Sequence, residues 1–320
     1  FNLGRIYRYA TLLLGMKPAD HEYKVMGLAA YNSDTYGKDS YQIYKETLQV
    51  DGLKFKYKKQ IKDHFFYFKE RFESHRFDSI AYGVQKFTEE ILTKWISNGI
   101  KHSNITNIIM SGGVAQNIKA NKCISELQSL DQLFVPPGPG DESISIGAAW
   151  LQYIKKGGEI RDIPIYTNAY FGPSYSQDEI NAEIEKLDLD YFEAKKVKIK
   201  EVAELIANGE VVAHFSEDPM EFGARALGNR SILADPRNQE TITHINKLVK
   251  MRDFWMPFAP SILEEKQDDY IVNPKRIDAR YMAIGFDSTQ LAKKHLSAGL
   301  HPFDKTMRPQ IVNKNDNKKY

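Results

Sequence analysis

The chain has 320 residues, of which 42% are hydrophobic and 27% charged, a composition typical of folded proteins that excludes wholesale disorder. Lysine and arginine number 44 against 42 acidic residues, and a net charge of +2 does not fit a general polyanion binder. The single cysteine, Cys123, excludes an intrachain disulfide framework and an all-cysteine metal site. The longest apolar runs, such as 12–14, are too short to span a bilayer. The length favours two domains.

The first third of the chain predicts two helices around a less regular segment. Apolar residues spaced for one helical face indicate a helix over 3–14, which Gly15 and Pro18 end. Residues 33–75 are rich in Tyr, Lys and Asp with weak periodicity, and we interpret them as an irregular or small β insertion. A second amphipathic helix is predicted over 79–97.

Alternating strands and helices follow, which indicates an α/β fold. We predict a strand at 105–110, a helix over 115–130, a strand at the start of LFVPPGPGDES, and a helix that Gly157 and Gly158 end. Residues 159–175 lack periodicity and contain Pro and Gly, so we place the domain boundary there. Beyond it we predict helices at 177–187, 199–208 and 241–250, and a strand in EVVAHF.

Paired glycines separate the strand at 105–110 from the helix after it. Gly112 and Gly113 leave backbone N–H groups exposed at the positive end of that helix, where phosphate binds without a cationic side chain. A simple strand-to-helix turn explains the same spacing. From the residues alone, both interpretations stay open.

Asp141 follows the stiff PPGPG turn and opens a helix. It fits a helix N-cap, and it also fits an anionic metal or nucleotide ligand. The eight histidines include no pair three or four residues apart, so a complete metal site is not visible in the sequence.

The segment EFGARALGNRSILADPR is the most informative part of the sequence. Arg225, Arg230 and Arg237 alternate with small and apolar residues, which favours guanidinium groups in a partly buried anion pocket. Pairing of an arginine with Asp235 and contact with nucleic acid are the alternatives. Lys247, Lys250 and Arg252 follow and extend the same cluster.

The other polar or aromatic candidates are interpreted as structural. The aromatic residues of FWMPFAPSIL are predicted to be core. His214 is predicted to be half-buried, and Cys123 to be a packing thiol.

Five motifs in chain order resemble the O-carbamoyltransferases of the nodulation-factor and antibiotic-tailoring type. They are HEYKVMGLAAY, MSGGVAQNIKAN, PPGPGDESISIGAA, EFGARALGNRSILADPR and FWMPFAPSIL. The resemblance implies part of an actin-like ATPase (RNase H-like) domain at 1–160, a linker at 161–175, and a YrdC-like α/β domain, truncated at its C-terminus, at 176–320.

The resemblance also implies a two-step reaction in the cytoplasm. Carbamoyl phosphate and ATP, with Mg²⁺, give carbamoyl adenylate in the YrdC-like domain. The actin-like domain, with bound Fe²⁺, then passes the carbamoyl group to a hydroxyl of a small molecule or glycan and releases AMP. Neither a membrane nor a nucleic acid is an expected partner, and a homodimer stays open.

The matching positions imply the site residues. Arg225, Arg230, Lys250 and Arg252 would be catalytic, and Asp141 would be a metal ligand. The nucleotide- and phosphate-binding residues would be Lys24, Gly27, Gly112, Gly113, Asn117, Asn229, Ser261 and Arg308.

The chain departs from the family pattern in three places. The family's His-x-x-x-His metal pair and an early aspartate, and its late NTSFN motif, have no counterpart here, and Met256 stands where many members have arginine. We therefore expect an internal fragment with an incomplete acceptor site. A threonylcarbamoyl-type tRNA-modification enzyme and an inactive nucleotide-binding scaffold are the alternatives.

Overall fold

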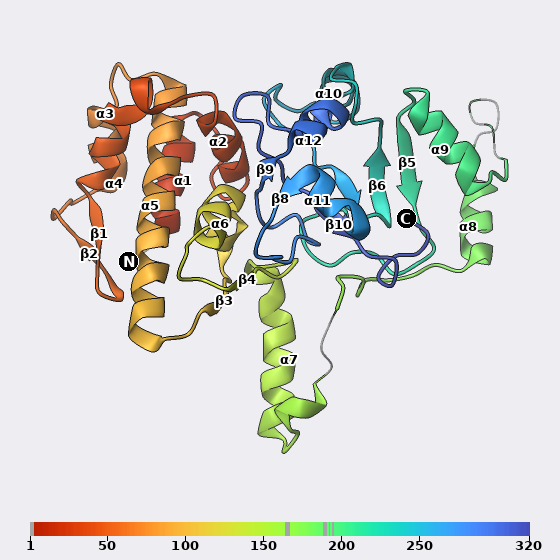
Figure 1. Cartoon of the computed structure of the whole chain (residues 1–320), viewed down its shortest axis with the longest axis horizontal. Helices are drawn as coiled ribbons and strands as arrows, with labels where there is room; N and C mark the ends of the chain where they lie inside the picture. The colour runs from red at the N-terminus through yellow and green to blue at the C-terminus, as the bar shows by residue number, and fades with distance from the viewer. Residues whose placement is uncertain (1–2, 164–166, 188–190, 192, 194) are drawn as a thin grey trace.

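The protein is a mixed α/β molecule in which helices dominate the N-terminal half (Figure 1). The computed structural model describes residues 3–163, 167–187, 191, 193 and 195–320. Residues 164–166 of the predicted linker lie outside the described residues.

One long helix, α5 (Phe77–Ser103), organises the N-terminal half. Helices α1 (Leu3–Leu13), α2 (Glu22–Ala29), α3 (Asp34–Lys45) and α6 (Ile118–Ser125) all contact it. The helix predicted at 79–97 is confirmed but extends further at both ends. It stops where Asn104 adopts a left-handed conformation, with φ of 58°, which a helix interior does not accept.

The prediction of an irregular or small β insertion at 33–75 is wrong in part. The segment contains α3, a hairpin of β1 (Leu48–Asp51) with β2 (Lys54–Tyr57), and α4 (His64–Arg71). Tyr44 of α3 packs against Phe68 and Phe72, and all three side chains are buried. Aromatic packing between α3 and α4 stabilises helices that weak local periodicity did not indicate.

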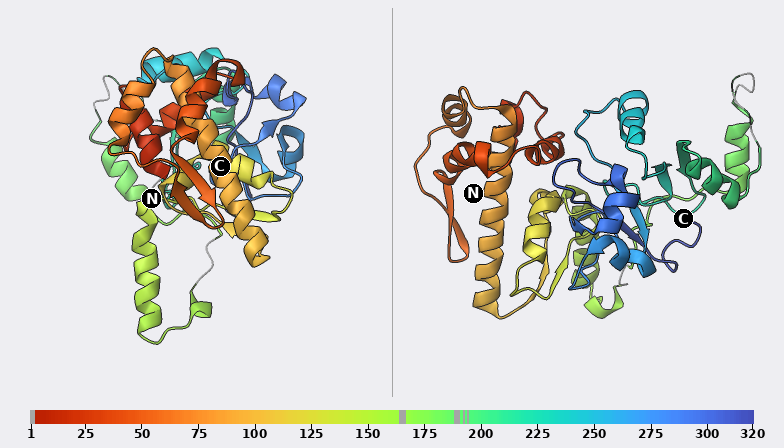
Figure 2. Two further views of the ribbon diagram at one scale, coloured as in Figure 1. Left: turned by 90° about the vertical axis from the view of Figure 1, so that its left-hand side faces the viewer. Right: turned by 45° about the horizontal axis from the view of Figure 1, so that its top comes forward.

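The glycine segment lies after the first of two short parallel strands, β3 (Asn107–Ile109) and β4 (Gln132–Phe134). A 3₁₀ turn, η1 (Gly113–Gln116), comes next, and α6 then ends well before residue 130. Asn117 separates the two because its side chain accepts a hydrogen bond from the Ala120 N–H as the N-cap of α6. Another 3₁₀ turn, η2 (Asp141–Ser143), leads into α7 (Ile144–Lys155), which projects from the rest of the molecule in Figures 1 and 2.

The C-terminal half consists of short elements joined by long loops. Its helices are η3 (Ile160–Asp162), α8 (Gln177–Ile184), α9 (Ile199–Ala207), α10 (Glu240–His244), the π-helical turn η4 (Ile245–Val249), η5 (Glu264–Lys266), α11 (Gln267–Tyr270), α12 (Gln290–His295) and η6 (Ser297–Gly299). Its strands pair as antiparallel β5 (Val212–Phe215) with β6 (Arg230–Leu233), parallel β7 (Ser261–Leu263) with β10 (Gln310–Val312), and antiparallel β8 (Ile271–Val272) with β9 (Asp287–Ser288). The helix predicted at 241–250 is thus α10 followed by a wider π turn.

The N-terminal half, which ends with α7, and the C-terminal half, which begins with η3, share one hydrophobic core. A single cluster of buried side chains includes Val84 and Ile124 from the first half and Ile284 and Ile311 from the second. In the part of the chain that the structure describes, no helix is long and apolar enough to cross a membrane.

Lys275 adds a polar connection between the halves. Its Nζ donates to the carbonyl oxygens of Ser125 and Leu130, both at 2.9 Å, and to that of Leu127. These carbonyls lie at the C-terminal end of α6 and just beyond it, where helix carbonyls lack partners within the helix. The ammonium group therefore caps α6 from the opposite half of the chain.

We predict that Lys275→Met lowers the free energy of unfolding by about 2 kcal/mol, because the substitution leaves carbonyl acceptors without their charged donor. Urea denaturation measures the change. Lys266→Met is the control, since Lys266 is exposed and forms only a 3.7 Å ion pair with Asp269. Equal stability losses in the two variants would contradict the capping role.

Candidate anion-binding pocket

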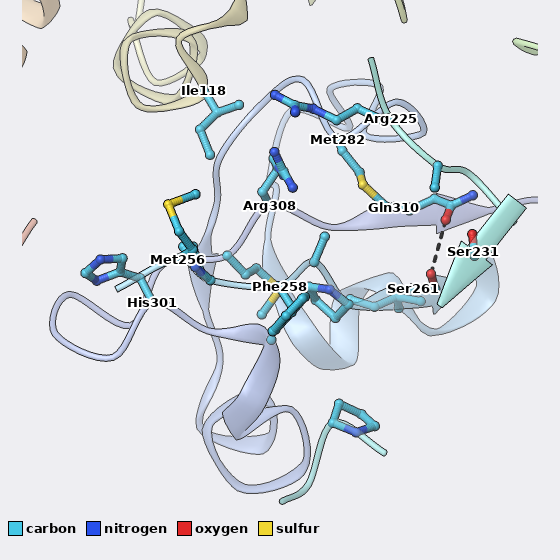
Figure 3. A pocket seen from close by; sticks show the side chains of 18 of the residues that line it. Ile118, Arg225, Ser231, Met256, Phe258, Ser261, Met282, His301, Arg308 and Gln310 are labelled. Atoms are coloured by element: carbon cyan, nitrogen blue, oxygen red, sulfur yellow. Dashed lines mark hydrogen bonds between the residues drawn. The ribbon is translucent and has the colours of Figure 1, made fainter. Parts of the chain in front are cut away.

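A cavity of about 830 Å³ lies where the two halves meet. The N-terminal half contributes residues of α2 and α6, including Gly27 and Ile118. The C-terminal half contributes β6, β7, β10 and the loop from 250 to 260 that precedes β7. Figure 3 shows side chains from both halves around this cavity. Its size is in the range of small-ligand sites.

Three arginines from distant parts of the chain line the cavity: Arg225, Arg252 and Arg308. The guanidinium groups of Arg225 and Arg308 lie near each other in Figure 3. In the described part of the chain, none of the three side chains forms an ion pair. Among the described residues of the lining, the one acidic side chain is Asp304, which pairs with Lys119, so the cavity has an excess of positive charge.

The electrostatics of these side chains reflect that imbalance. Burial lowers the pKa of Arg225, and the positive charge of Arg252 lowers it further. Burial also lowers the pKa of Arg308, to which Arg225 and Arg252 both add repulsion. The pKa of Lys250 at the cavity wall is lowered by burial and by Arg252. A multiply charged anion would relieve the repulsion and replace the lost hydration.

Polar uncharged groups line another part of the cavity. The Ser261 hydroxyl is 3.1 Å from the Gln310 Oε1, to which it donates, and 2.6 Å from the Tyr320 hydroxyl. The Gln310 amide donates to the Leu227 carbonyl at 2.7 Å. Ser261 thus lines the cavity as expected, but with hydrogen-bond partners inside the protein.

Two other residues of the arginine motif lie outside the cavity lining. Asn229 is buried, donates to the Pro219 carbonyl at 2.7 Å and accepts from Asn317 at 2.9 Å. Arg230 is exposed at the start of β6, and its backbone N–H donates to the Glu221 carboxylate at 3.0 Å. The structure therefore places Arg225 in the cavity lining and Arg230 outside it.

Arg237 follows the alternative interpretation of this motif. Its guanidinium group pairs with the Asp235 carboxylate at 2.6 Å, and the arginine side chain is largely exposed. Of the two interpretations of the motif, pairing with Asp235 applies to Arg237, and a place in the anion pocket applies to Arg225.

The glycine segment lies apart from the lining of this cavity. Gly112 has φ of 97°, which L side chains rarely adopt, and its N–H donates to the Pro139 carbonyl at 2.6 Å. A Cβ on Gly112 or Gly113 would meet nothing within 4 Å, so close packing does not require glycine at either position. Asn117 exchanges side-chain hydrogen bonds with Gln85, at 3.0 and 3.1 Å.

The two predicted residues of α2 are placed differently from each other. Gly27 lines the cavity, and a Cβ there would lie 3.6 Å from the Trp255 ring. Lys24 lies outside the lining and pairs with the Asp253 carboxylate at 2.8 Å.

Asp141 is exposed as the first residue of η2, but it is not an N-cap: Gly140 is the N-cap of η2 and Ser143 that of α7, and neither helix has a side-chain cap hydrogen bond. Among the described residues, no group of three or more His, Cys, Asp or Glu side chains could hold a metal ion. The residues present do not fit a complete Fe²⁺ site, and we derive no chemical step through a metal.

Several cavity residues were missed by sequence reasoning. Met282, Gln310 and Tyr320 line the cavity, and no local pattern marks them; Tyr23 also lines it and lies in the motif HEYKVMGLAAY, but was not singled out there. Phe258, predicted to be core, lies in the cavity wall beneath the Arg252 guanidinium, 5.3 Å from the ring centre. The same prediction is wrong for Phe254, whose side chain is 77% exposed.

The two structural interpretations of single polar residues hold. His214 is half-buried on β5, with Nδ1 2.6 Å from the Gly228 carbonyl. Burial raises the pKa of the Cys123 thiol to about 11, which fits a packing thiol better than a nucleophile.

The fold and cavity define an α/β protein with an anion-binding pocket between two halves, and sequence comparison gives its family. The Carbamoyltransferase N-terminus family model matches residues 1–150, and the Carbamoyltransferase C-terminus model matches residues 203–320. Together they cover most of the chain. The chain belongs to the carbamoyltransferase family.

Individual relatives agree with that assignment. The uncharacterized protein MJ1058 of Methanocaldococcus jannaschii is 33% identical over the whole of this chain, which covers 53% of that protein. The nodulation protein NolNO of Sinorhizobium fredii is 30% identical, and NolO of Bradyrhizobium diazoefficiens 29%, again over the whole chain. The chain covers 47% and 59% of these two proteins, so it spans about half the length of its curated relatives.

We predict that Arg308→Met raises the free energy of unfolding of the ligand-free protein by about 1 kcal/mol, because it removes a buried charge that Arg225 and Arg252 repel. The same variant should lose binding of inorganic phosphate. Thermal unfolding at low ionic strength and titration calorimetry measure the two effects. Arg237→Met, which removes an exposed arginine outside the cavity, should bind phosphate like the wild type. A destabilised Arg308 variant would contradict the repulsion argument.

Proposed function

We propose that the chain carries the adenylate-forming part of an ATP-dependent O-carbamoyltransferase. The observation that carries the proposal is the set of three guanidinium groups in one cavity, without an ion-pair partner among the described residues. ATP and carbamoyl phosphate are both phosphate-rich, and each suits such a site. Membership in the carbamoyltransferase family supplies the reaction class.

The proposed first step is chemically balanced. Water cleaves carbamoyl phosphate to carbamate and phosphate. A carbamate oxygen then bonds to the α-phosphorus of ATP, the bond to the β-phosphate oxygen breaks, and pyrophosphate leaves. Charge builds on the phosphate oxygens during this displacement, so fixed guanidinium groups stabilise the transition state. Mg²⁺ bound to ATP would neutralise part of the same charge.

The cavity residues take distinct parts in this proposal. Arg225 and Arg308 bind phosphate oxygens, and Arg252 and Lys250 widen the cationic surface over the leaving pyrophosphate. Ser261 orients a polar group of the substrate through the hydrogen bonds that it shares with Gln310 and Tyr320. Asn229 and the backbone of Arg230 shape the wall from behind, through their bonds to Pro219 and Glu221.

The second step is proposed for the first half of the protein. Gly112, Gly113 and Asn117 would hold the adenylate, and transfer of the carbamoyl group to a hydroxyl of a small molecule or glycan would release AMP. The strand–glycine–helix order of β3 and α6 supports a nucleotide site there. The actin-like and YrdC-like fold assignments belong to the same proposal. Two relatives are named nodulation proteins, which agrees with the nodulation-factor type of carbamoyltransferase that the motifs resemble.

Pyrophosphate exchange tests the first step with this chain alone, because it needs no acceptor. We predict that labelled pyrophosphate enters ATP only when carbamoyl phosphate and Mg²⁺ are present. Arg225→Ala should slow the exchange about 100-fold, the scale seen when one charge-stabilising group is removed from an active site. Arg237→Ala, from the same motif but outside the cavity, should exchange like the wild type.

The outcome separates the alternatives. ATP binding without any dependence on carbamoyl phosphate would overturn the adenylate-forming role and leave a nucleotide-binding scaffold. Exchange that instead requires threonine and bicarbonate would favour the threonylcarbamoyl type of enzyme.

A further inference from the structure

We propose that Asp253, paired with Lys24, is a positioning residue that holds Arg252 in the anion pocket. The inference rests on the proposed function, because it concerns how the pocket keeps its third guanidinium group. It assigns Lys24 an indirect role in place of direct nucleotide contact.

The pair joins the two halves beside the cavity. Lys24 lies on α2, and its Nζ is 2.8 Å from the Asp253 Oδ2 in the loop before β7. The two side chains are 18% and 33% exposed, so solvent screens this pair less than a surface pair. Neither residue lines the cavity, whereas Arg252, next to Asp253 in the chain, does.

Arg252 needs an external hold because its neighbours repel it. The positive charge of Arg252 contributes to the lowered pKa of three neighbours, Arg225, Lys250 and Arg308. Like charges in a partly buried site repel each other more strongly than on the surface, because water screens them less. Without a bound anion, that repulsion favours conformations of Arg252 that lie farther from the other three charges.

Backbone hydrogen bonds, the buried Met256 side chain and a ring contact between Phe254 and Tyr31 all hold this loop. The Arg252 N–H donates to the Asn246 carbonyl at 2.7 Å, and the Asn246 amide donates to the Met256 carbonyl at 3.0 Å. Met251, just before Arg252, has φ of 47°, in the left-handed region that a methionine rarely adopts. The Lys24–Asp253 ion pair adds a charged contact to these backbone hydrogen bonds. It connects the loop to α2, in the opposite wall of the pocket.

Other contacts of Arg252 agree with a side chain that is kept in one position in the cavity. Its guanidinium lies over the Phe258 ring, while its Nε is buried without a hydrogen-bond partner in the described structure. Burial lowers the pKa of Arg252, and Tyr23 and the negative charge of Asp253 oppose that shift. A buried donor without a hydrogen-bond partner is costly. Other contacts must therefore keep the Arg252 side chain in place until a ligand accepts a hydrogen bond from it.

Pyrophosphate exchange measured at varied ATP concentration tests the role. Asp253→Asn and Lys24→Met should each raise the KM for ATP about tenfold, the loss expected when a charged hydrogen bond to phosphate is weakened. The double variant should match either single variant, because both act through one contact. Lys24→Arg keeps the pair and should keep the wild-type KM.

Asp287→Asn is the matched control. Asp287 pairs with Lys122 at 3.2 Å and also joins the two halves, but outside the cavity lining. It should leave the KM unchanged, whatever it does to thermal stability. A further increase of KM in the double Lys24/Asp253 variant would overturn the proposal, because Lys24 would then act on the nucleotide itself.

The result also separates this inference from the proposed function. Wild-type exchange together with a wild-type KM in Asp253→Asn would overturn the positioning role and leave the function standing. If the wild type shows no exchange, the proposed function fails. The affinity for inorganic phosphate then decides the positioning role: a loss in Asp253→Asn but not in Asp287→Asn supports it, and equal affinities overturn it.

Discussion

Repulsion among three partly buried guanidinium groups is the constraint around which this protein is built. Arg225, Arg252 and Arg308 come from separate segments; burial lowers the pKa of all three, and the charge of Arg252 lowers those of Arg225 and Arg308 further. Only a firm scaffold keeps such groups together. Binding energy that would otherwise move side chains is then available for holding phosphate oxygens.

The scaffold is the junction between the two halves. A single hydrophobic cluster crosses it, and polar contacts fix its edges. The buried His301 donates from Nε2 to the Gly27 carbonyl at 3.1 Å, which ties the loop after η6 to α2. Because α2 also contacts α5, the position of the pocket wall is set by the longest helix of the protein.

Local patterns in the sequence predicted much of this arrangement. They failed where contacts between residues far apart in the chain decide the position of a side chain or the formation of a helix. The spacing of small residues around Arg225 indicated a pocket, yet the same spacing included Arg230 and Arg237. Arg237 is turned aside by Asp235, two residues away, and Arg230 starts an exposed strand edge. Arg308 was expected only from family resemblance, because its partners lie some 56 to 83 residues earlier in the chain. The helices within 33–75 depend on tertiary aromatic packing in the same way.

The capping of α6 by Lys275 has a consequence for the order of events during synthesis. The ammonium group is 145 to 150 residues downstream of the carbonyls that it satisfies. A ribosome adds about 5–20 residues per second, so the end of α6 waits many seconds for its cap while the rest of the first half is already available to pack. Long sequence separation of this kind slows the last stage of folding. The first half of the nascent chain therefore spends that interval with an uncapped end of α6, until the 273–277 segment emerges.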